Sequence, residues 1–254
     1  MLIDKTKLGV SFFDAHFGGI YRGRSVLCVG RHASGKSILS CQFVNQALLD
    51  GDKALLLSRH QAHDTIIVGE SLGFPFTNAV ARGDLTLLEY NTFIPESNAG
   101  ANVLLPPQVF MELQEIIEEK SIRRVVFDTV LPWVAIQPTS RLAEHISSFI
   151  RAIERLGVTV LLNLPKPASN PSHMLKGRLE DQCPIVIHLN CEGVATRTFS
   201  VPKYLGEAQN VCPVFPFEIT SRNGFKLLIG YADRASSANV LQPARFSSAI
   251  NVYQ

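Results

Sequence analysis

The chain carries a glycine-rich stretch at positions 30 to 37: Gly30-Arg31-His32-Ala33-Ser34-Gly35-Lys36-Ser37. It matches the pattern G-x-x-x-x-G-K-[ST] and lies between an apolar run that predicts a strand and a run that predicts a helix. Glycines let the backbone wrap closely around phosphate oxygens, and the N–H groups that open the helix form a positive concavity. The pattern therefore predicts a nucleotide site lined by all eight residues. Lys36 would reach the β- and γ-phosphates and the Ser37 hydroxyl would ligate Mg²⁺. The competing interpretation is a glycine-rich turn that binds no nucleotide.

A second candidate for this site follows a later apolar run. The run is Arg123-Arg124-Val125-Val126-Phe127-Asp128. An acidic residue at the end of a buried strand is typical of the Walker B position, which holds the magnesium ion of a bound nucleotide. Asp128 is thus predicted to hold Mg²⁺ directly or through water, and ATP with Mg²⁺ is the predicted cofactor. The alternative is a strand-end aspartate that caps a loop.

Short β-rich runs alternate with amphipathic runs over the first two thirds of the chain, which is typical of a parallel sheet with crossover helices. The predicted strands are Ser25–Gly30, Lys53–Ser58, Leu85–Glu89, Arg124–Asp128 and Val158–Asn163. The predicted helices are Lys36–Leu49, Thr65–Leu72, Pro107–Lys120 and Ser140–Leu156. This pattern predicts an α/β fold with a mostly parallel central sheet flanked by helices.

The pattern changes after Asn163. The stretch LPKPASNPSH predicts a loop, because proline fixes φ and lacks a backbone donor. Four strands without helices between them are predicted to form C-terminal antiparallel hairpins, with a turn at Asn223-Gly224. These strands are Pro184–Asn190, Ala195–Val201, Phe215–Ile219 and Phe225–Ile229. We expect one domain over residues 1–230 and a tail over residues 231–254, which is rich in Ser, Ala and Asn.

Composition limits the function classes. The 254 residues are 46% hydrophobic and 18% charged, with a net charge of +2, which excludes a disordered or fibrous protein and disfavours a strongly basic nucleic-acid binder. The five scattered cysteines predict buried thiols in a reducing compartment. We found neither a signal peptide nor an apolar run long enough to span a bilayer, so we expect a cytoplasmic location and no membrane insertion.

Other stretches carry a family resemblance. The run before the first predicted strand is Phe13-Asp14-Ala15-His16-Phe17-Gly18-Gly19-Ile20-Tyr21-Arg22-Gly23. It resembles the lead-in of the RecA-like ATPases of the KaiC family, as Ser71-Leu72-Gly73-Phe74 and Pro216-Phe217-Glu218-Ile219-Thr220 resemble later parts of that family. The resemblance covers roughly Leu8 to Leu228. It implies a RecA-like P-loop fold that binds ATP or ADP and assembles into a homo-oligomeric, hexameric ring.

The chain departs from this family after the second predicted strand. KaiC-like ATPases carry one or two acidic residues there, and a glutamate polarises the attacking water, whereas this chain has Arg59 and His60. A cation cannot accept the proton of that water. The remaining catalytic candidates are His60, as a neutral base, and Gln61, which could orient water.

A second departure concerns the expected ring. In the family, a K-x-R pair from the neighbouring subunit reaches the γ-phosphate. Here the lysine is retained as Lys203, the in-trans candidate, but Leu205 stands at the arginine position. Loss of an arginine in trans removes charge stabilisation from the transition state. We therefore expect ATP binding with weak or absent hydrolysis, in which nucleotide controls conformation or ring assembly in a regulatory or scaffolding role.

Three other functions remain open at this point. A DNA-repair or recombinase paralogue would bind DNA in an ATP-dependent manner, and the modest basic cluster of Lys166 with Lys176-Gly177-Arg178 is its candidate surface. A slow but genuine ATPase motor subunit, working with partner proteins, is the second. A small-molecule kinase is disfavoured because an arginine-rich lid is not evident. Arg31 and His32 in the loop could contact phosphates, a neighbour or solvent.

Overall fold

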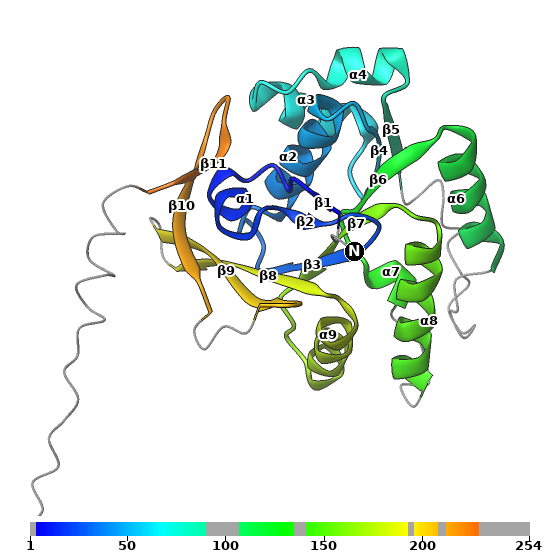
Figure 1. Cartoon of the computed structure of the whole chain (residues 1–254), viewed down its shortest axis with the longest axis vertical. Coiled ribbons are helices and arrows are strands. Elements are labelled where there is room, and N and C mark those ends of the chain that lie inside the picture. The colour runs from blue at the N-terminus through cyan, green and yellow to red at the C-terminus, as the bar shows by residue number, and fades with distance from the viewer. Residues whose placement is uncertain (1–3, 90–106, 135–140, 193–195, 208–211, 229–254) are drawn as a thin grey trace, which may run out of the picture.

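Among the described residues, nine strands form one sheet in the order β11-β10-β9-β8-β3-β7-β6-β4-β5 (Figure 1). The computed structural model describes residues 4–89, 107–134, 141–192, 196–207 and 212–228. The predicted tail, residues 231–254, lies outside these ranges, so the division at residue 230 stays a prediction. None of the described helices is long and apolar enough to span a membrane.

Six neighbouring strands run parallel: β8 (Ile185–Glu192), β3 (Ser25–Gly30), β7 (Thr159–Pro165), β6 (Ile122–Phe127), β4 (Lys53–Ser58) and β5 (Leu85–Glu89). The sheet continues antiparallel through β9 (Thr196–Tyr204), β10 (Val214–Thr220) and β11 (Gly224–Leu227). A separate antiparallel pair joins β1 (Lys5–Thr6) to β2 (Ile20–Tyr21). The predicted fold class, a mostly parallel sheet with antiparallel C-terminal strands, is confirmed.

Helices cover both faces of the sheet (Figure 1). One face carries α1 (Ser11–Phe17), α2 (Lys36–Leu49), α3 (Ala62–Ser71) and α4 (Phe76–Arg82); the other carries α6 (Pro107–Glu119), α7 (Leu131–Val134), α8 (Leu142–Arg155) and α9 (Asn170–Gln182). Successive side chains of a strand point to opposite faces. In β3, Val26 and Cys28 join one apolar core, and Leu27 and Val29 join the other. Burial on both faces explains why this strand has no polar alternation.

The structure corrects the sequence prediction between β7 and β8. We expected a loop and no helix there, but α9 occupies Asn170–Gln182. Pro171 lies in the first helical turn, where a missing N–H costs nothing, and Ser169 and Ser172 form a capping box. The prediction that the four C-terminal strands form antiparallel hairpins is confirmed, and the structure adds that β8, besides its antiparallel pairing with β9, pairs parallel with β3 and so joins the hairpins to the parallel sheet.

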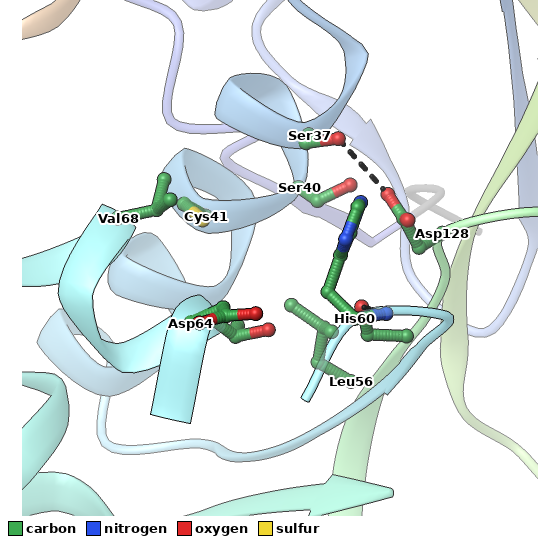
Figure 2. A pocket seen from close by; sticks show the side chains of 10 residues that line it. Ser37, Ser40, Cys41, Leu56, His60, Asp64, Val68 and Asp128 are labelled. Carbon is green, nitrogen blue, oxygen red and sulfur yellow. Dashed lines mark hydrogen bonds between the residues drawn. The ribbon is translucent and has the colours of Figure 1, made fainter. Parts of the chain in front are cut away.

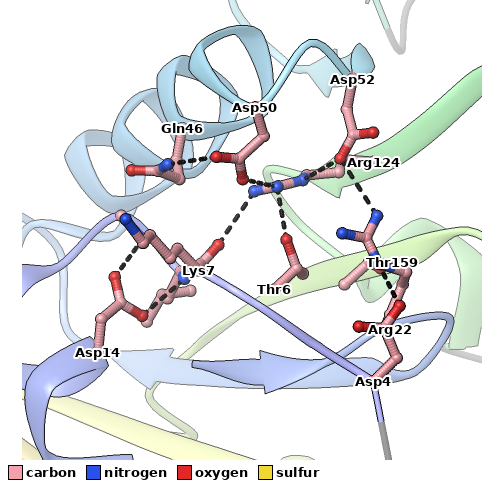
Figure 3. A network of polar contacts seen from close by, with 12 residues as sticks. Asp4, Thr6, Lys7, Asp14, Arg22, Gln46, Asp50, Asp52, Arg124 and Thr159 are labelled. Atoms are coloured by element: carbon pink, nitrogen blue, oxygen red, sulfur yellow. Dashed lines mark hydrogen bonds and ion pairs between the residues drawn. The ribbon is translucent and has the colours of Figure 1, made fainter. Parts of the chain in front are cut away.

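A buried arginine fixes the start of β6 to the segment before the glycine-rich loop (Figure 3). Arg124 is 1% exposed and forms ion pairs with Asp50 and Asp52, which follow α2. Its guanidinium also donates to Thr6 Oγ1 at 2.6 Å and to the Lys7 carbonyl at 3.0 Å. These bonds join β1, the C-terminal end of α2 and β6, and so hold α2 against the sheet at the end opposite the candidate site.

Candidate functional site

The glycine-rich loop leaves β3 at Gly30 and enters α2 at Lys36. A Cβ at Gly30 would lie 2.3 Å from Ser34 Oγ and 2.9 Å from the Leu189 carbonyl oxygen, so only glycine fits there. Gly35 has a φ of 108° and precedes α2 without a side-chain cap. The first N–H groups of a helix have no acceptor within it, and the buried Ser34 hydroxyl likewise lacks a partner among the described residues. Uncapped donors gathered at a helix N-terminus suit an anion.

The ammonium group of Lys36 lies over this loop. Its Nζ donates to the carbonyls of Gly30 at 2.8 Å and Arg31 at 2.7 Å. Burial lowers the pKa of Lys36, and the positive charge of Arg59 lowers it further, whereas Asp128 opposes the shift. The cation is therefore held at the loop by carbonyl oxygens, where a phosphate would stabilise its charge.

Two oxygens meet beside Lys36. Ser37 Oγ, in the first turn of α2, donates to Asp128 Oδ1 at 3.2 Å. Asp128 directly follows β6, and its N–H donates to the Leu57 carbonyl of β4 at 2.9 Å, which extends the pairing of β6 with β4. A hydroxyl and a carboxylate oxygen are donors that Mg²⁺ accepts alongside water and phosphate oxygens. The pair therefore fits the magnesium ion that the sequence predicts.

A cavity of about 170 Å³ opens next to this pair (Figure 2). It is lined by Ser37, Ser40, Cys41, Leu56, Ser58, His60, Asp64, Thr65, Val68 and Asp128. The predicted candidate His60 thus shares a cavity with Ser37 and Asp128, whereas Gln61 is exposed and precedes α3 outside that lining. Burial raises the pKa of the Cys41 thiol to about 12, so Cys41 is not a thiolate nucleophile near neutral pH.

Sequence reasoning missed Asp64, a carboxylate in the lining of this cavity. Helix α3 begins at Ala62, three residues earlier than predicted, and this places Asp64 in its first turn. The N–H of Ala62 donates to Glu89 Oε1 at 2.8 Å, so a side chain at the end of β5 fixes where α3 starts. The sequence shows Asp64 four residues after His60, but only the position at which α3 begins places its carboxylate in the cavity.

The second glycine of the loop touches the C-terminal hairpin. A Cβ on Gly35 would lie 3.2 Å from both Ile219 Cδ1 and Phe225 Cζ. The N–H of Phe225 donates to Gln42 Oε1 at 2.9 Å, and Gln42 Nε2 donates to the Gly9 carbonyl at 2.6 Å. Thus α2 joins the loop, the β10–β11 hairpin and the N-terminal segment.

The remaining predicted residues lie outside the cavity. Arg31, His32 and Ala33 are exposed at the tip of the loop. Lys203 Nζ donates to the carbonyls of Glu180 at 2.7 Å and Asp181 at 2.9 Å, in the last turn of α9. Lys203 pairs with Val186 near the start of β8, away from the loop of its own chain.

A comparison with protein families matches residues 6–229 to the family described as "ATPase: KaiC". The chain belongs to the KaiC family of ATPases. This membership confirms the resemblance predicted from the sequence.

Individual relatives of this KaiC-family chain are consistent with that membership. The chain is 26% identical over 152 residues to the archaeal flagellar ATP-binding protein FlaH of Sulfolobus acidocaldarius. This match covers 59% of the chain and 64% of FlaH. It is 24% identical over 229 residues to the circadian clock protein KaiC2 of Synechocystis. That match covers 88% of the chain and 40% of KaiC2. Each match thus spans less than two thirds of the relative's own length. The crystal structure of a KaiC-like protein from Pyrococcus horikoshii shares the fold, with a TM-score of 0.71 and 20% identity over 89% of this chain and 100% of that one.

Proposed function

We propose that this KaiC-family chain binds ATP with Mg²⁺ at Gly30–Ser37 and hydrolyses it weakly or not at all, so that bound nucleotide controls conformation or ring assembly. The observation that carries the proposal is the 3.2 Å contact between Ser37 Oγ and Asp128 Oδ1 beside the Lys36 ammonium. It brings together the hydroxyl, the carboxylate and the cation that a magnesium-bound triphosphate requires.

Each residue has a separate task in this proposal. The N–H groups that open α2 and the Lys36 ammonium would bind the β- and γ-phosphates, while Ser37 and Asp128 would hold the ion. Mg²⁺, when bound, neutralises charge on the phosphate oxygens. The β10–β11 hairpin, packed on Gly35, would respond when the loop is filled.

Weak turnover follows from what stands at the two catalytic positions. Arg59 and His60 stand where the family carries its acidic residues, one of which polarises the attacking water, and the Arg59 cation cannot accept a proton. Leu205, 52% exposed, occupies the position of the arginine that a neighbour supplies. Without the base and the arginine, bound ATP would persist and serve as a structural ligand.

Ring assembly is the second part of the proposal. Lys203 lies away from the loop of its own chain, as a residue that serves a neighbour's site must. To reach a neighbour, its ammonium would exchange the two α9 carbonyls for phosphate. Nucleotide at the subunit boundary would then favour assembly, which suits a regulatory or scaffolding role in a homo-oligomer or with partner ATPase-associated proteins.

Two measurements test the proposal. In a phosphate-release assay with saturating Mg·ATP, we expect the wild-type rate to match that of Lys36→Ala. A turnover of about 1 s⁻¹ or faster, ordinary for enzymes, would contradict weak hydrolysis. In light scattering, we expect a larger mass with ATP than with ADP, and an unchanged monomer with every nucleotide would contradict the assembly role.

One observation favours a second candidate function, that of a slow ATPase. His60 lines the cavity beside Ser37 and Asp128, and Asp64 lines the same cavity (Figure 2). A neutral histidine there could accept the proton of an attacking water. This function predicts slow phosphate release that His60→Ala abolishes while ATP binding is retained. Equal rates in wild type and His60→Ala would exclude His60 as the base.

A further inference from the structure

Arg59 leaves the sheet at the edge where the proposed nucleotide site lies. It directly follows Ser58, the last residue of β4, and β4 pairs with β6, so that Leu57 lies opposite Phe127. Asp128 is the residue directly after β6, and its N–H still donates to the Leu57 carbonyl. Arg59 therefore lies about one residue beyond the level of the proposed magnesium-binding carboxylate, on the neighbouring strand.

Hydrogen bonds hold the loop that carries Arg59 in place, while the guanidinium of Arg59 is free to bind a ligand. The N–H of His60 donates to Ser58 Oγ at 2.9 Å, and Ala62 is tied to Glu89, so both sides of Arg59 are fixed. Arg59 is exposed and has no ion pair or side-chain hydrogen bond within the described ranges. Its charge does act on Lys36, whose pKa it helps to lower.

Arg59 does not line the cavity itself, but it is a second cation near Lys36, where Asp128 has the larger effect on the pKa of Lys36 and Arg59 the smaller one. Lys36 and Arg59 repel each other in the absence of an anion, and Asp128 is the carboxylate that opposes this at Lys36. An anion placed between them would remove the repulsion and gain two attractions. The planar guanidinium donates in a fork that matches two oxygens of one phosphate, so a terminal phosphate is the chemical group that fits.

We propose that Arg59 binds the γ-phosphate in cis and makes the site prefer ATP over ADP. This inference rests on the proposed function. At one of the positions where the family carries its acidic residues, the arginine contributes to binding of the ground state. Interactions equally strong in ground and transition states tighten binding without accelerating the chemical step. The substitution therefore accounts for both retention of ATP and slow turnover.

The test is equilibrium binding of Mg·ATP and Mg·ADP by calorimetry to wild type, Arg59→Ala and Arg59→Lys. Arg151→Ala is the matched control, because Arg151 is an exposed arginine on α8, on the other face of the sheet. We expect Arg59→Ala to lose at least about tenfold in ATP affinity, the equivalent of one charged hydrogen bond, and to keep its ADP affinity within about twofold. Arg59→Lys keeps the charge but loses the forked donor geometry, so its ATP affinity should lie between those of wild type and Arg59→Ala.

Each outcome is decisive. Equal losses for ATP and ADP, or no loss for either, would overturn the role of Arg59 while leaving ATP binding intact. Failure of the wild type to bind either nucleotide would overturn the proposed function itself. A change in Arg151→Ala equal to that in Arg59→Ala would assign the effect to net charge and overturn the contact.

Discussion

Ser37 Oγ and Asp128 Oδ1 lie 3.2 Å apart, although 91 positions separate them in the sequence. The contact joins the first turn of α2 to the end of β6, and β7 lies between β3 and β6 in the sheet. The loop after β3 must therefore reach across one strand to meet this carboxylate. The contact links two motifs that the sequence shows only separately.

Substitution of that carboxylate should remove the magnesium dependence of nucleotide binding. Asp128→Asn keeps the size of the side chain and can still accept a hydrogen bond from Ser37, but it lacks the charge that attracts the ion. We expect Mg²⁺ to tighten ATP binding by wild type about tenfold or more and to have little effect on the variant. Calorimetric titration with Mg²⁺ and with excess chelator measures this, and equal magnesium dependence in the two proteins would refute the assignment.

The buried arginine of β6 should dominate the stability of the N-terminal segment. Arg124→Ala leaves Asp50 with only the Gln46 amide and Asp52 with only the 3.6 Å ion pair to Arg22, and it removes the donors to Thr6 and Lys7 (Figure 3). We expect a loss of roughly 3 kcal/mol, near the low end for a broken buried pair because both carboxylates keep partial solvent exposure. Chemical denaturation measures it.

The neighbouring arginine supplies the control for that change. Arg123 is exposed on the same strand, so Arg123→Ala should change the free energy of unfolding by no more than about 0.5 kcal/mol. Similar losses in the two variants would show that the Arg124 network contributes little.

A methyl group on the second loop glycine should damage both the loop and the hairpin. Gly35→Ala forces a side chain to a φ of 108° and against Ile219 and Phe225. Gly51→Ala is the control, since Gly51 has a φ of 77° but open space around its Cβ position. We expect Gly35→Ala to lose ATP binding and to unfold at a lower temperature than Gly51→Ala, which keeps binding. Normal ATP affinity in Gly35→Ala would contradict the close packing.

The carboxylate of Glu180 should make the folding stability depend on pH in the acidic range. Burial would raise its pKa, but hydrogen bonds from His188 and Lys176 outweigh burial and hold the pKa below its ordinary value. A lowered folded-state pKa adds stability that is present above the unfolded value near 4.5 and disappears as pH falls through the folded value. Glu180→Gln should therefore melt a few degrees below wild type at pH 6, with the gap closing below about pH 4. A gap that does not vary with pH would exclude this carboxylate as the cause.

Local signals in the sequence predict the elements around the site well. The bounds of β3, α2, β4 and β5 agree with the prediction, because continuous apolar runs and the glycine-rich motif mark them directly. Helix α9 was missed because prolines suggested a loop, although proline is accepted in a first turn. Short α1 and α4 were missed because seven residues give too little periodicity to recognise.

Contacts between distant segments were not predictable in this way. The bonds of Arg124 to Asp50 and Thr6, and of Lys203 to the end of α9, depend on how separate elements dock. The sequence shows Arg124 only as a charge at the start of an apolar run. Asp64 entered the cavity lining only once the start of α3 was known.

The central claim, that Gly30–Ser37 binds ATP, is tested most directly by calorimetric titration of Mg·ATP into wild type and Lys36→Ala. We predict saturable binding of one ATP per wild-type chain. In Lys36→Ala, affinity should fall at least about a hundredfold, because the lysine that meets the phosphates is lost. Absence of binding in the wild type, or equal affinity in the two proteins, would contradict it.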